Sequence, residues 1–414
     1  MIRVSLFVPR TALAALVALT VCARASPVQA TELTLWHAYR GEEKAALEKV
    51  IGTFNREHAK EGIHVLTLAV PYDAFADKIS AAVPRGKGPD VFISAQDRLG
   101  GWVEAGRTVE PIDFFADAEL RARYLPKTLE AMTYRKRLYG LPLDFKAVAM
   151  FYNRRLLAEP PRTSAELEAV AKKLTNRAAG RFGLAYDYSE FYYQAALLNA
   201  FGGRIFARGP RPVIDSPENV RSLEQLLRWM DVDAILPTEP STALVTSLFN
   251  DGKAAIVFSG PWFIGEIAPQ IDYGIAPLPT LTEAGGRPMA PWMTVEGVFV
   301  AASSQHIDDA FELAKALTGG AAARVLALEG RQLPADRGIY SDPAIARDPV
   351  LSAFRAQAET AIPLPNLPEM TMVWSPAARA MNAVTHRQLS PRAALEEVQK
   401  SVEHDIAGLR GSGQ

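Results

Sequence analysis

The chain has 414 residues, of which 49% are hydrophobic and 22% are charged. This composition excludes a disordered protein, and the length is sufficient for two substantial hydrophobic cores. The 45 basic and 46 acidic residues nearly balance, which gives no electrostatic basis for binding the backbone of a nucleic acid. We therefore expect a globular protein with two lobes or domains.

The first thirty residues, 1–30, have the pattern of a secretory signal peptide. Arg3 and Arg10 flank the front of an apolar stretch that is too short to span a membrane, and small residues lead to a cleavage point after Ala30. No later apolar run is long enough for a transmembrane helix. The sequence therefore predicts a soluble protein that is exported to the periplasm.

Removal of this segment also removes the single cysteine of the chain, Cys22. The mature chain would then contain no disulfide and no cysteine-ligated metal. The segment holds three arginines and no acids, so the mature chain would contain 42 basic and 46 acidic residues. Lipid attachment at Cys22 is a less favoured alternative, because Val21 stands where such sites have Gly, Ala or Ser.

Strands and helices alternate in the first part of the mature chain. Short apolar or alternating runs predict strands at residues 32–36, 63–70 and 89–95. Between them, apolar residues at helical spacing predict one helix after Gly41 and another over residues 72–83. This order is typical of an α/β lobe with a largely parallel sheet.

The same alternation restarts further along the chain. Buried strands are predicted at residues 148–153, within 252–262 and within 294–303. Helix starts are predicted at the capping residues Thr163, Ser216 and Ser390. The restart supports a second α/β lobe.

The stretch SAQDRLGG follows the predicted strand at residues 89–95 and contains Asp97 and Arg98. In open α/β sheets, ligands bind beyond the carboxyl ends of the strands, so these two residues are placed at a binding site. From the sequence alone, the simpler role for Asp97 is to cap the helix that begins near Leu99. Arg98 has no comparable structural role.

No motif of an enzyme or of a cofactor site is present. The signatures of nucleophilic hydrolases, phosphate loops, dinucleotide sites and zinc proteases are absent from the sequence. The six histidines lack the spacing of metal ligands. We expect no metal and no cofactor. Carboxylate pairs suited to glycoside hydrolysis stay an open alternative, because 46 acidic residues offer many pairs.

Aromatic residues beside predicted turns carry more information. They are Trp36, Tyr39, Tyr192, Tyr193, Trp262 and Trp374. Flat faces of sugar rings stack on aromatic side chains, while charged groups bind the hydroxyls. For any single ring, packing under its own loop is the better explanation. Together they favour a carbohydrate-binding cleft.

Five segments in this order and spacing resemble the maltose-binding protein branch of the solute-binding proteins of ATP-driven sugar importers. They are GPDVFISAQDRLGGWVEAG, YGLPLDFKAVAMFYN, GKAAIVFSGPW, YGIAPLPT and PNLPEMTMVW. The resemblance implies an α/β periplasmic-binding-protein fold, with two lobes joined by a hinge around an interlobe ligand cleft. The lobes implied are residues 31–144 with 292–341 and residues 145–291 with 342–414.

The resemblance also implies a set of sugar-binding residues. The matching positions are Asp97, Arg98, Glu190, Tyr192, Tyr193, Trp262 and Trp374, with Tyr39, Arg40, Asp144 and Lys146 as further candidates. Lys146 stands where maltose-binding proteins have a glutamate, for which Asp144 is a possible substitute. Arg40 is a possible replacement in a first loop that lacks the usual Asp–Lys pair. Ala378 and Ser94 replace an arginine and a tryptophan of that site. We therefore expect a sugar other than simple maltodextrin.

The function expected from this resemblance is capture of a di- or oligosaccharide of the maltose or trehalose class and its delivery to an ABC-type membrane permease. The protein would be a monomer and not an enzyme. Two alternatives stay open. A secreted glycoside hydrolase would use a carboxylate pair such as Asp97 and Glu190. A sensing or adhesion protein would need the same closing cleft as a transport protein.

Overall fold

The computed structural model describes residue 2, residues 30–207 and residues 209–411. The predicted signal segment and Cys22 lie outside these described residues, except for residue 2 and Ala30. Among the described residues, no helix combines the length and the apolar character that a membrane crossing needs.

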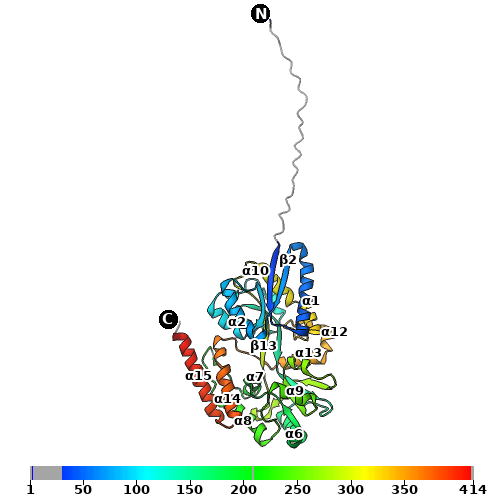
Figure 1. Ribbon diagram of the computed structural model, residues 1–414, viewed down its shortest axis with the longest axis vertical. Helices are drawn as coiled ribbons and strands as arrows, with labels where there is room; N and C mark the ends of the chain where they lie inside the picture. Colours follow the sequence, from blue (N-terminus) through cyan, green and yellow to red (C-terminus); the bar gives the residue numbers. More distant parts are fainter. Residues whose placement is uncertain (1, 3–29, 208, 412–414) are drawn as a thin grey trace.

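Two separate β-sheets organise the chain into an upper and a lower part in Figure 1. The first sheet has the order β14-β13-β3-β1-β2, with β6 also paired to β13. Its strands are β1 (Thr31–His37), β2 (Ile63–Ala69), β3 (Val91–Ala95), β6 (Gly140–Ala147), β13 (Trp292–Val300) and β14 (Ile362–Pro363). β1 is parallel to β2 and β3, whereas β13 is antiparallel to β3 and β6. The expected α/β lobe is thereby confirmed, with a mixed sheet.

The second sheet has the order β10-β7-β9-β8. Its strands are β7 (Ala149–Asn153), β8 (Phe182–Ala185), β9 (Ala254–Ser259) and β10 (Tyr273–Ala276). Two further pairs are short hairpin-like ladders, β4 (Thr133–Tyr134) with β5 (Arg137–Leu138) and β11 (Thr280–Leu281) with β12 (Arg287–Pro288).

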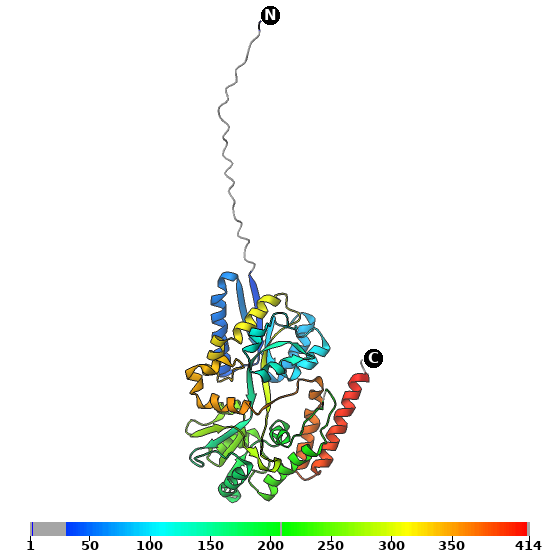
Figure 2. The ribbon, with the colours of Figure 1, turned by 180° about the vertical axis from the view of Figure 1, so that it is seen from behind.

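Helices surround each sheet, as the two opposite views of Figures 1 and 2 show. In the upper part these are α1 (Gly41–Glu57), α2 (Tyr72–Ala82), α3 (Leu99–Ala105), α4 (Ala118–Ala122), α5 (Pro126–Ala131), α10 (Ile307–Leu317) and α11 (Gly320–Glu329). In the lower part they are α6 (Ser164–Leu174), α7 (Phe191–Ala200), α8 (Pro217–Leu227), α9 (Thr242–Asn250), α14 (Trp374–Thr385) and α15 (Pro391–Gly411). Between the two parts lie α12 (Pro343–Ala346) and α13 (Pro349–Ala358), the latter in contact with β6, β7 and β10.

The sequence patterns explain where these helices form. In α1, Leu47, Val50, Ile51 and Phe54 are buried, as their helical spacing predicts. The hydroxyls of Thr163, Ser216 and Ser390 accept hydrogen bonds from backbone N–H groups of the first turns of α6, α8 and α15. The three predicted helix starts are therefore confirmed.

The chain changes from one sheet to the other at a single residue, Val148, which separates β6 from β7. It returns to the first sheet at β13, and after β14 it leaves for α14 and α15. The predicted limit at 144/145 falls inside β6, so this part of the predicted second lobe pairs with the first sheet. The assignment of whole lobes, residues 31–144 with 292–341 and 145–291 with 342–414, stays a proposal.

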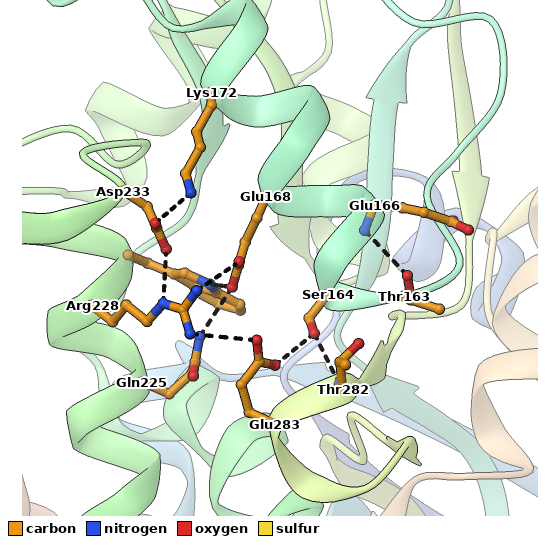
Figure 3. A network of polar contacts seen from close by, with 11 residues as sticks. Thr163, Ser164, Glu166, Glu168, Lys172, Gln225, Arg228, Asp233, Thr282 and Glu283 are labelled. Carbon is orange, nitrogen blue, oxygen red and sulfur yellow. Dashed lines mark hydrogen bonds and ion pairs between the residues drawn. The ribbon is translucent and has the colours of Figure 1, made fainter.

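A buried polar network holds α6 against the end of α8 in the lower part (Figure 3). Residues Arg228–Val232 continue α8 as a π-helical turn, which places the Trp229 ring in the core with no exposed surface. The Glu168 carboxylate accepts hydrogen bonds from Trp229 Nε1 at 2.8 Å and from Arg228 and Gln225 at 3.3 Å. One carboxylate therefore satisfies two donors from the irregular turn and one from the last turn of α8.

Replacement of Glu168 by Ala is expected to destabilise the protein by about 2–3 kcal/mol, because the buried Trp229 N–H loses its acceptor. Urea unfolding monitored by far-UV circular dichroism measures this change. Glu168→Gln is the matched control, since its amide oxygen can still accept from Trp229, and it should lose less stability. A loss below 1 kcal/mol for Glu168→Ala would contradict the role of the network.

Candidate functional site

A pocket of about 290 Å³ opens at the carboxyl ends of β1 and β3. Its lining residues are Ala38, Tyr39, Phe75, Ala76, Asp77, Ile93, Ser94, Ala95, Asp97, Arg98 and Glu296. They come from β3 itself, from the segments that follow β1 and β3, from α2 and from β13. The location is the one at which α/β sheets bind ligands.

Asp97 and Arg98 both line this pocket. The Arg98 Nε atom lies 3.7 Å from Asp97 Oδ2. Burial raises the pKa of Asp97, and the Arg98 guanidinium only partly opposes this effect. The capping role expected for Asp97 is wrong: the chain makes a 3-10 turn at Gln96–Arg98, and α3 then begins after Arg98 without a side-chain cap.

Gln96 fastens this turn to the first sheet. It lies between Ala95 and Asp97 in the sequence, and its side chain is completely buried. The amide nitrogen donates to the carbonyls of Met293 and Leu364 at 3.2 Å, and the amide oxygen accepts from Val295 N at 2.8 Å. The position of Asp97 and Arg98 is therefore fixed relative to β13 and to the segment that follows β14.

A cluster of charged and phenolic groups surrounds two of the pocket-lining residues, Tyr39 and Glu296. We call it the polar cluster (Tyr39, Glu43, Asp144, Lys146 and Glu296). Tyr39 Oη donates to Glu296 Oε2 at 2.8 Å and lies 3.3 Å from Asp144 Oδ2. Lys146 Nζ is 3.2 Å from Glu296 Oε1 and 3.4 Å from Glu43 Oε1. Three carboxylates thus share one lysine and one tyrosine.

Burial and crowding of like charges perturb the titration of the polar cluster. The pKa of Asp144 is raised well above its ordinary value, first by burial and then by the Glu296 carboxylate. Its Oδ1 atom is buried without a hydrogen-bond partner. Burial alone would lower the pKa of Lys146, but the carboxylates of Glu296, Asp144 and Glu43 raise it. The cluster therefore holds a lysine cation and favours a protonated Asp144.

His37, the last residue of β1, orients Tyr39. Its Nδ1 atom accepts a hydrogen bond from the Tyr39 N–H at 3.0 Å. Burial, assisted by the Lys44 charge, lowers the pKa of His37 to about 4. The imidazole is therefore neutral near pH 7, the form that can accept this bond.

Four aromatic residues of the lower part and Trp292 of β13 form a second group, the aromatic cluster (Tyr192, Tyr193, Trp262, Trp292 and Trp374). The Tyr192 ring centroid lies 6.3 Å from Trp262 and 6.2 Å from Trp292, which is 5.7 Å from Trp374. Trp262 is 40% exposed. Its ring lies against Gly260, where a Cβ atom would be only 2.2 Å from the indole, so the absence of a side chain permits this placement.

β13 joins the polar and the aromatic clusters. Trp292, Thr294 and Glu296 alternate along this strand and share one of its faces. Tyr192 Oη is 3.3 Å from both Trp292 O and Thr294 Oγ1, while Glu296 contacts Tyr39 and lines the pocket. On the neighbouring β6, Lys146 pairs with Thr294 and Asp144 with Glu296. The pocket and the aromatic rings therefore lie along one strand face.

Nine of the residues expected at the site belong to the pocket lining, the polar cluster or the aromatic cluster, but two do not. Glu190 is exposed immediately before α7, and Arg40 is exposed immediately before α1; neither is among the residues that line the pocket. Two participants were not expected: Glu296 and Trp292. Glu296 is a charged residue inside the apolar strand TVEGVFVAAS, which is the signal that identifies it, because buried charges require partners.

Among the described residues, no group of three or more His, Cys, Asp or Glu side chains is arranged to hold a metal ion. The polar cluster contains three carboxylates, but Lys146 occupies the space between two of them. The chemistry available at the site is hydrogen bonding to carboxylates and to a guanidinium, with aromatic surface beside it.

Comparisons with known proteins identify the family and agree with the fold. Residues 38–323 match the family described as bacterial extracellular solute-binding protein. A maltotriose-binding protein of Pyrococcus abyssi is 31% identical over 340 residues, covering 80% of this chain and 73% of the relative. A galactooligosaccharide-binding protein of Bacillus subtilis is 27% identical over 92% of this chain and 91% of its own length. The crystal structure of a cyclo/maltodextrin-binding protein complexed with maltotetraose superposes with a TM-score of 0.83 at 30% identity, covering 91% and 97% of the two chains.

The raised pKa of Asp144 predicts a pH-dependent stability. The folded state binds this proton more tightly than the unfolded chain, so the contribution is fully present below about pH 4, the ordinary range of Asp. It is lost as the pH rises through the folded pKa, at up to about 1.4 kcal/mol per pH unit. Asp144→Asn cannot titrate, and its melting temperature should increasingly exceed that of the wild type as the pH rises from 4.

Asp113→Asn provides a control of opposite sign. Burial is the largest single influence and raises the pKa of Asp113, but the combined hydrogen bonds from Leu138 N, Arg137 and Arg121 outweigh it and lower the pKa. Its contribution to stability is therefore present above about pH 4 and is lost as the pH falls. Thermal scans of the three proteins between about pH 2 and 8 measure both trends, the Asp113 trend below pH 4 and the Asp144 trend above it. A constant difference between Asp144→Asn and the wild type over this range would show that Asp144 titrates normally.

Proposed function

The chain belongs to the bacterial extracellular solute-binding protein family, and from this premise we propose that it captures a di- or oligosaccharide of the maltose or trehalose class and delivers it to the membrane permease subunits of an ABC-type importer. The two relatives are named for binding maltotriose and galactooligosaccharide, and the similar crystal structure contains maltotetraose. These ligands are short chains of neutral sugar rings.

The observation that carries the proposal is the shared face of β13. One end of this face borders the pocket at Glu296, and the other contacts the rings of Tyr192 and Trp374 through Trp292. The pocket volume of about 290 Å³ is at the lower end of the range for small-molecule sites. A sugar chain would therefore place one ring in the pocket and extend the next over the aromatic cluster.

In this proposal the site residues have different roles. Asp97 and Arg98 bind hydroxyl groups in the pocket, as an acceptor and a donor. Tyr192, Tyr193, Trp262 and Trp374 provide aromatic surface for stacking. Tyr39 lines the pocket with Asp144 and Lys146 behind it in the polar cluster, and the exposed Arg40 and Glu190 would contact the part of the sugar outside the pocket.

Transport requires that the ligand stabilises one conformation over another. A sugar that contacts Asp97 in the upper part and Trp262 in the lower part favours the arrangement in which the two parts are close. The permease would then recognise this closed form. Uptake of the sugar in cells with and without the permease distinguishes transport from a sensing or adhesion role. The protein would act as a monomer and without a cofactor.

We propose that binding occurs without turnover of the sugar. The hydrolase alternative requires a carboxylic acid opposite a second carboxylate at the bond to be cleaved. Of the two candidates for such a pair, Asp97 lines the pocket and Glu190 does not. A reducing-end assay on each sugar that binds tests this alternative, and release of new reducing ends would establish hydrolysis.

The proposed location is the periplasm, after cleavage of residues 1–30. The exported protein should begin with Thr31, and N-terminal sequencing of protein from an osmotic-shock fraction measures this. A membrane-bound form that begins at Cys22 would instead show lipid attachment. Cys22→Ser is the control, because it should leave the distribution of a cleaved soluble protein unchanged.

Sugar binding is tested with the purified protein, residues 31–414. In a thermal-shift screen of mono-, di- and trisaccharides, a ligand at a hundred times its Kd should add about 2.7 kcal/mol of stability. Titration of the tryptophan fluorescence then gives the Kd of each hit. No response to any sugar would overturn the proposed function.

Trp262→Ala should raise the Kd of the bound sugar about threefold to tenfold, since a stacked ring contributes about 0.5–1.5 kcal/mol. Phe114→Ala is the matched control, because Phe114 is 94% exposed and is not among the pocket or aromatic-cluster residues. Isothermal titration calorimetry measures both variants. Equal affinity of Trp262→Ala and wild type would remove Trp262 from the site.

A further inference from the structure

Glu296 is the one pocket-lining residue that β13 contributes. Its side chain is largely buried, and it faces the same pocket as Asp97 and Arg98. A carboxylate in such a place is costly unless its oxygens are paired. Its function must therefore be read from its partners.

Each carboxylate oxygen of Glu296 has a partner within the protein. Oε2 accepts the Tyr39 hydroxyl at 2.8 Å, and Oε1 lies 3.2 Å from Lys146 Nζ. The Tyr39 hydroxyl is also within 3.3 Å of Asp144, and Lys146 is also within 3.4 Å of Glu43. These contacts fix the orientation of the carboxylate before any ligand binds.

Lys146 directs its charge at carboxylates and not at the pocket. It does not belong to the residues that line the pocket, and its side chain is only 22% exposed. The ammonium group lies between Glu43 and Glu296, both of which attract it. Direct donation from Lys146 to a ligand would require it to leave one of these partners.

Glu296 keeps free capacity on the pocket side. An ionised carboxylate has about four acceptor positions and no donor. Tyr39 and Lys146 occupy one position on each oxygen. The remaining positions are available only to a donor, such as a sugar hydroxyl, that enters the pocket.

We infer that Glu296 is a specificity-determining ligand contact that accepts a hydrogen bond from one hydroxyl of a neutral sugar ring, and that Lys146 and Tyr39 are positioning residues that act through it. The inference rests on the proposed function and deepens it. It assigns the inner end of the pocket to a hydroxyl donor. It also changes the expected role of Lys146, which would orient Glu296 and would not contact the ligand.

A ligand–protein double-mutant cycle tests the contact. The Kd of the best sugar from the screen and of its monodeoxy derivatives is measured for wild type and for Glu296→Ala. In wild type, one derivative should bind about tenfold to a hundredfold more weakly, because a hydrogen bond to a charged group is lost. In Glu296→Ala, the same derivative and the parent sugar should bind within about twofold of each other.

Three outcomes are informative. If each deoxy penalty is the same in Glu296→Ala as in wild type, the ligand contact is refuted while the proposed function stands. If the wild type binds no sugar, the proposed function fails, and the assignment of Glu296 fails with it. If Glu296→Ala does not fold, Glu296→Gln takes its place, since it keeps the shape and weakens the acceptor. A deoxy penalty in Glu296→Gln equal to that of wild type would then refute the contact.

A second cycle separates positioning from direct contact. Lys146→Met should raise the Kd of the parent sugar about threefold to tenfold, because Glu296 loses the counter-ion that orients it. In the Glu296→Ala background, Lys146→Met should add no further loss. If the two losses multiply, Lys146 contacts the ligand itself and its positioning role is wrong. Lys172→Met is the control, because Lys172 is paired with Asp233 in the network of Figure 3.

Discussion

The central position of β13 between β3 and β6 is the constraint on which the site depends. Both neighbours are antiparallel to β13, and each contributes residues to the pocket or to its wall. A slip of one residue would turn Trp292, Thr294 and Glu296 to the opposite face, because side chains alternate along a strand. Gln96 secures the register, since its amide pairs with both Met293 O and Val295 N.

The polar cluster is costly for the fold. Buried ion pairs are often no more stable than well-packed apolar side chains of similar size. Here two carboxylates pair with one lysine, and Asp144, which contacts the Tyr39 hydroxyl, leaves an oxygen without a partner. Such a cluster is better explained by binding than by stability, because it places the Glu296 carboxylate at the pocket. The proposed role of Glu296 gives a physical reason to keep charges where apolar residues would serve stability better.

The two parts of the molecule contribute different surfaces to the cleft. The upper part supplies charged and hydrogen-bonding groups on segments that are fastened to the first sheet. The lower part supplies the aromatic rings on α7, α14 and the turn after β9. Tyr192 Oη reaches the β13 backbone at 3.3 Å, so the lower part already touches the strand that carries Glu296. Only one residue, Val148, separates β6 from β7, and a movement between the parts must be absorbed at such short connections.

The sequence by itself determined the elements and the class of fold. Helical spacing of Leu47, Val50 and Phe54, the caps at Thr163 and Ser216, and the apolar strand before Asp97 are local patterns, and the structure has them where they were expected. Only the tertiary structure decided the site. β6 and β13 are about 150 residues apart in the chain, and the contacts of Glu296 with Tyr39 and Lys146 exist only because strand pairing brings these segments together. For Asp97 the sequence offered two roles, a helix cap from its local pattern and a binding residue from its place after a strand. The structure excludes the cap, because a 3-10 turn held by Gln96 brings Asp97 to the pocket. Local propensities act over a few residues, but the position of a charge in a cleft depends on register between distant strands.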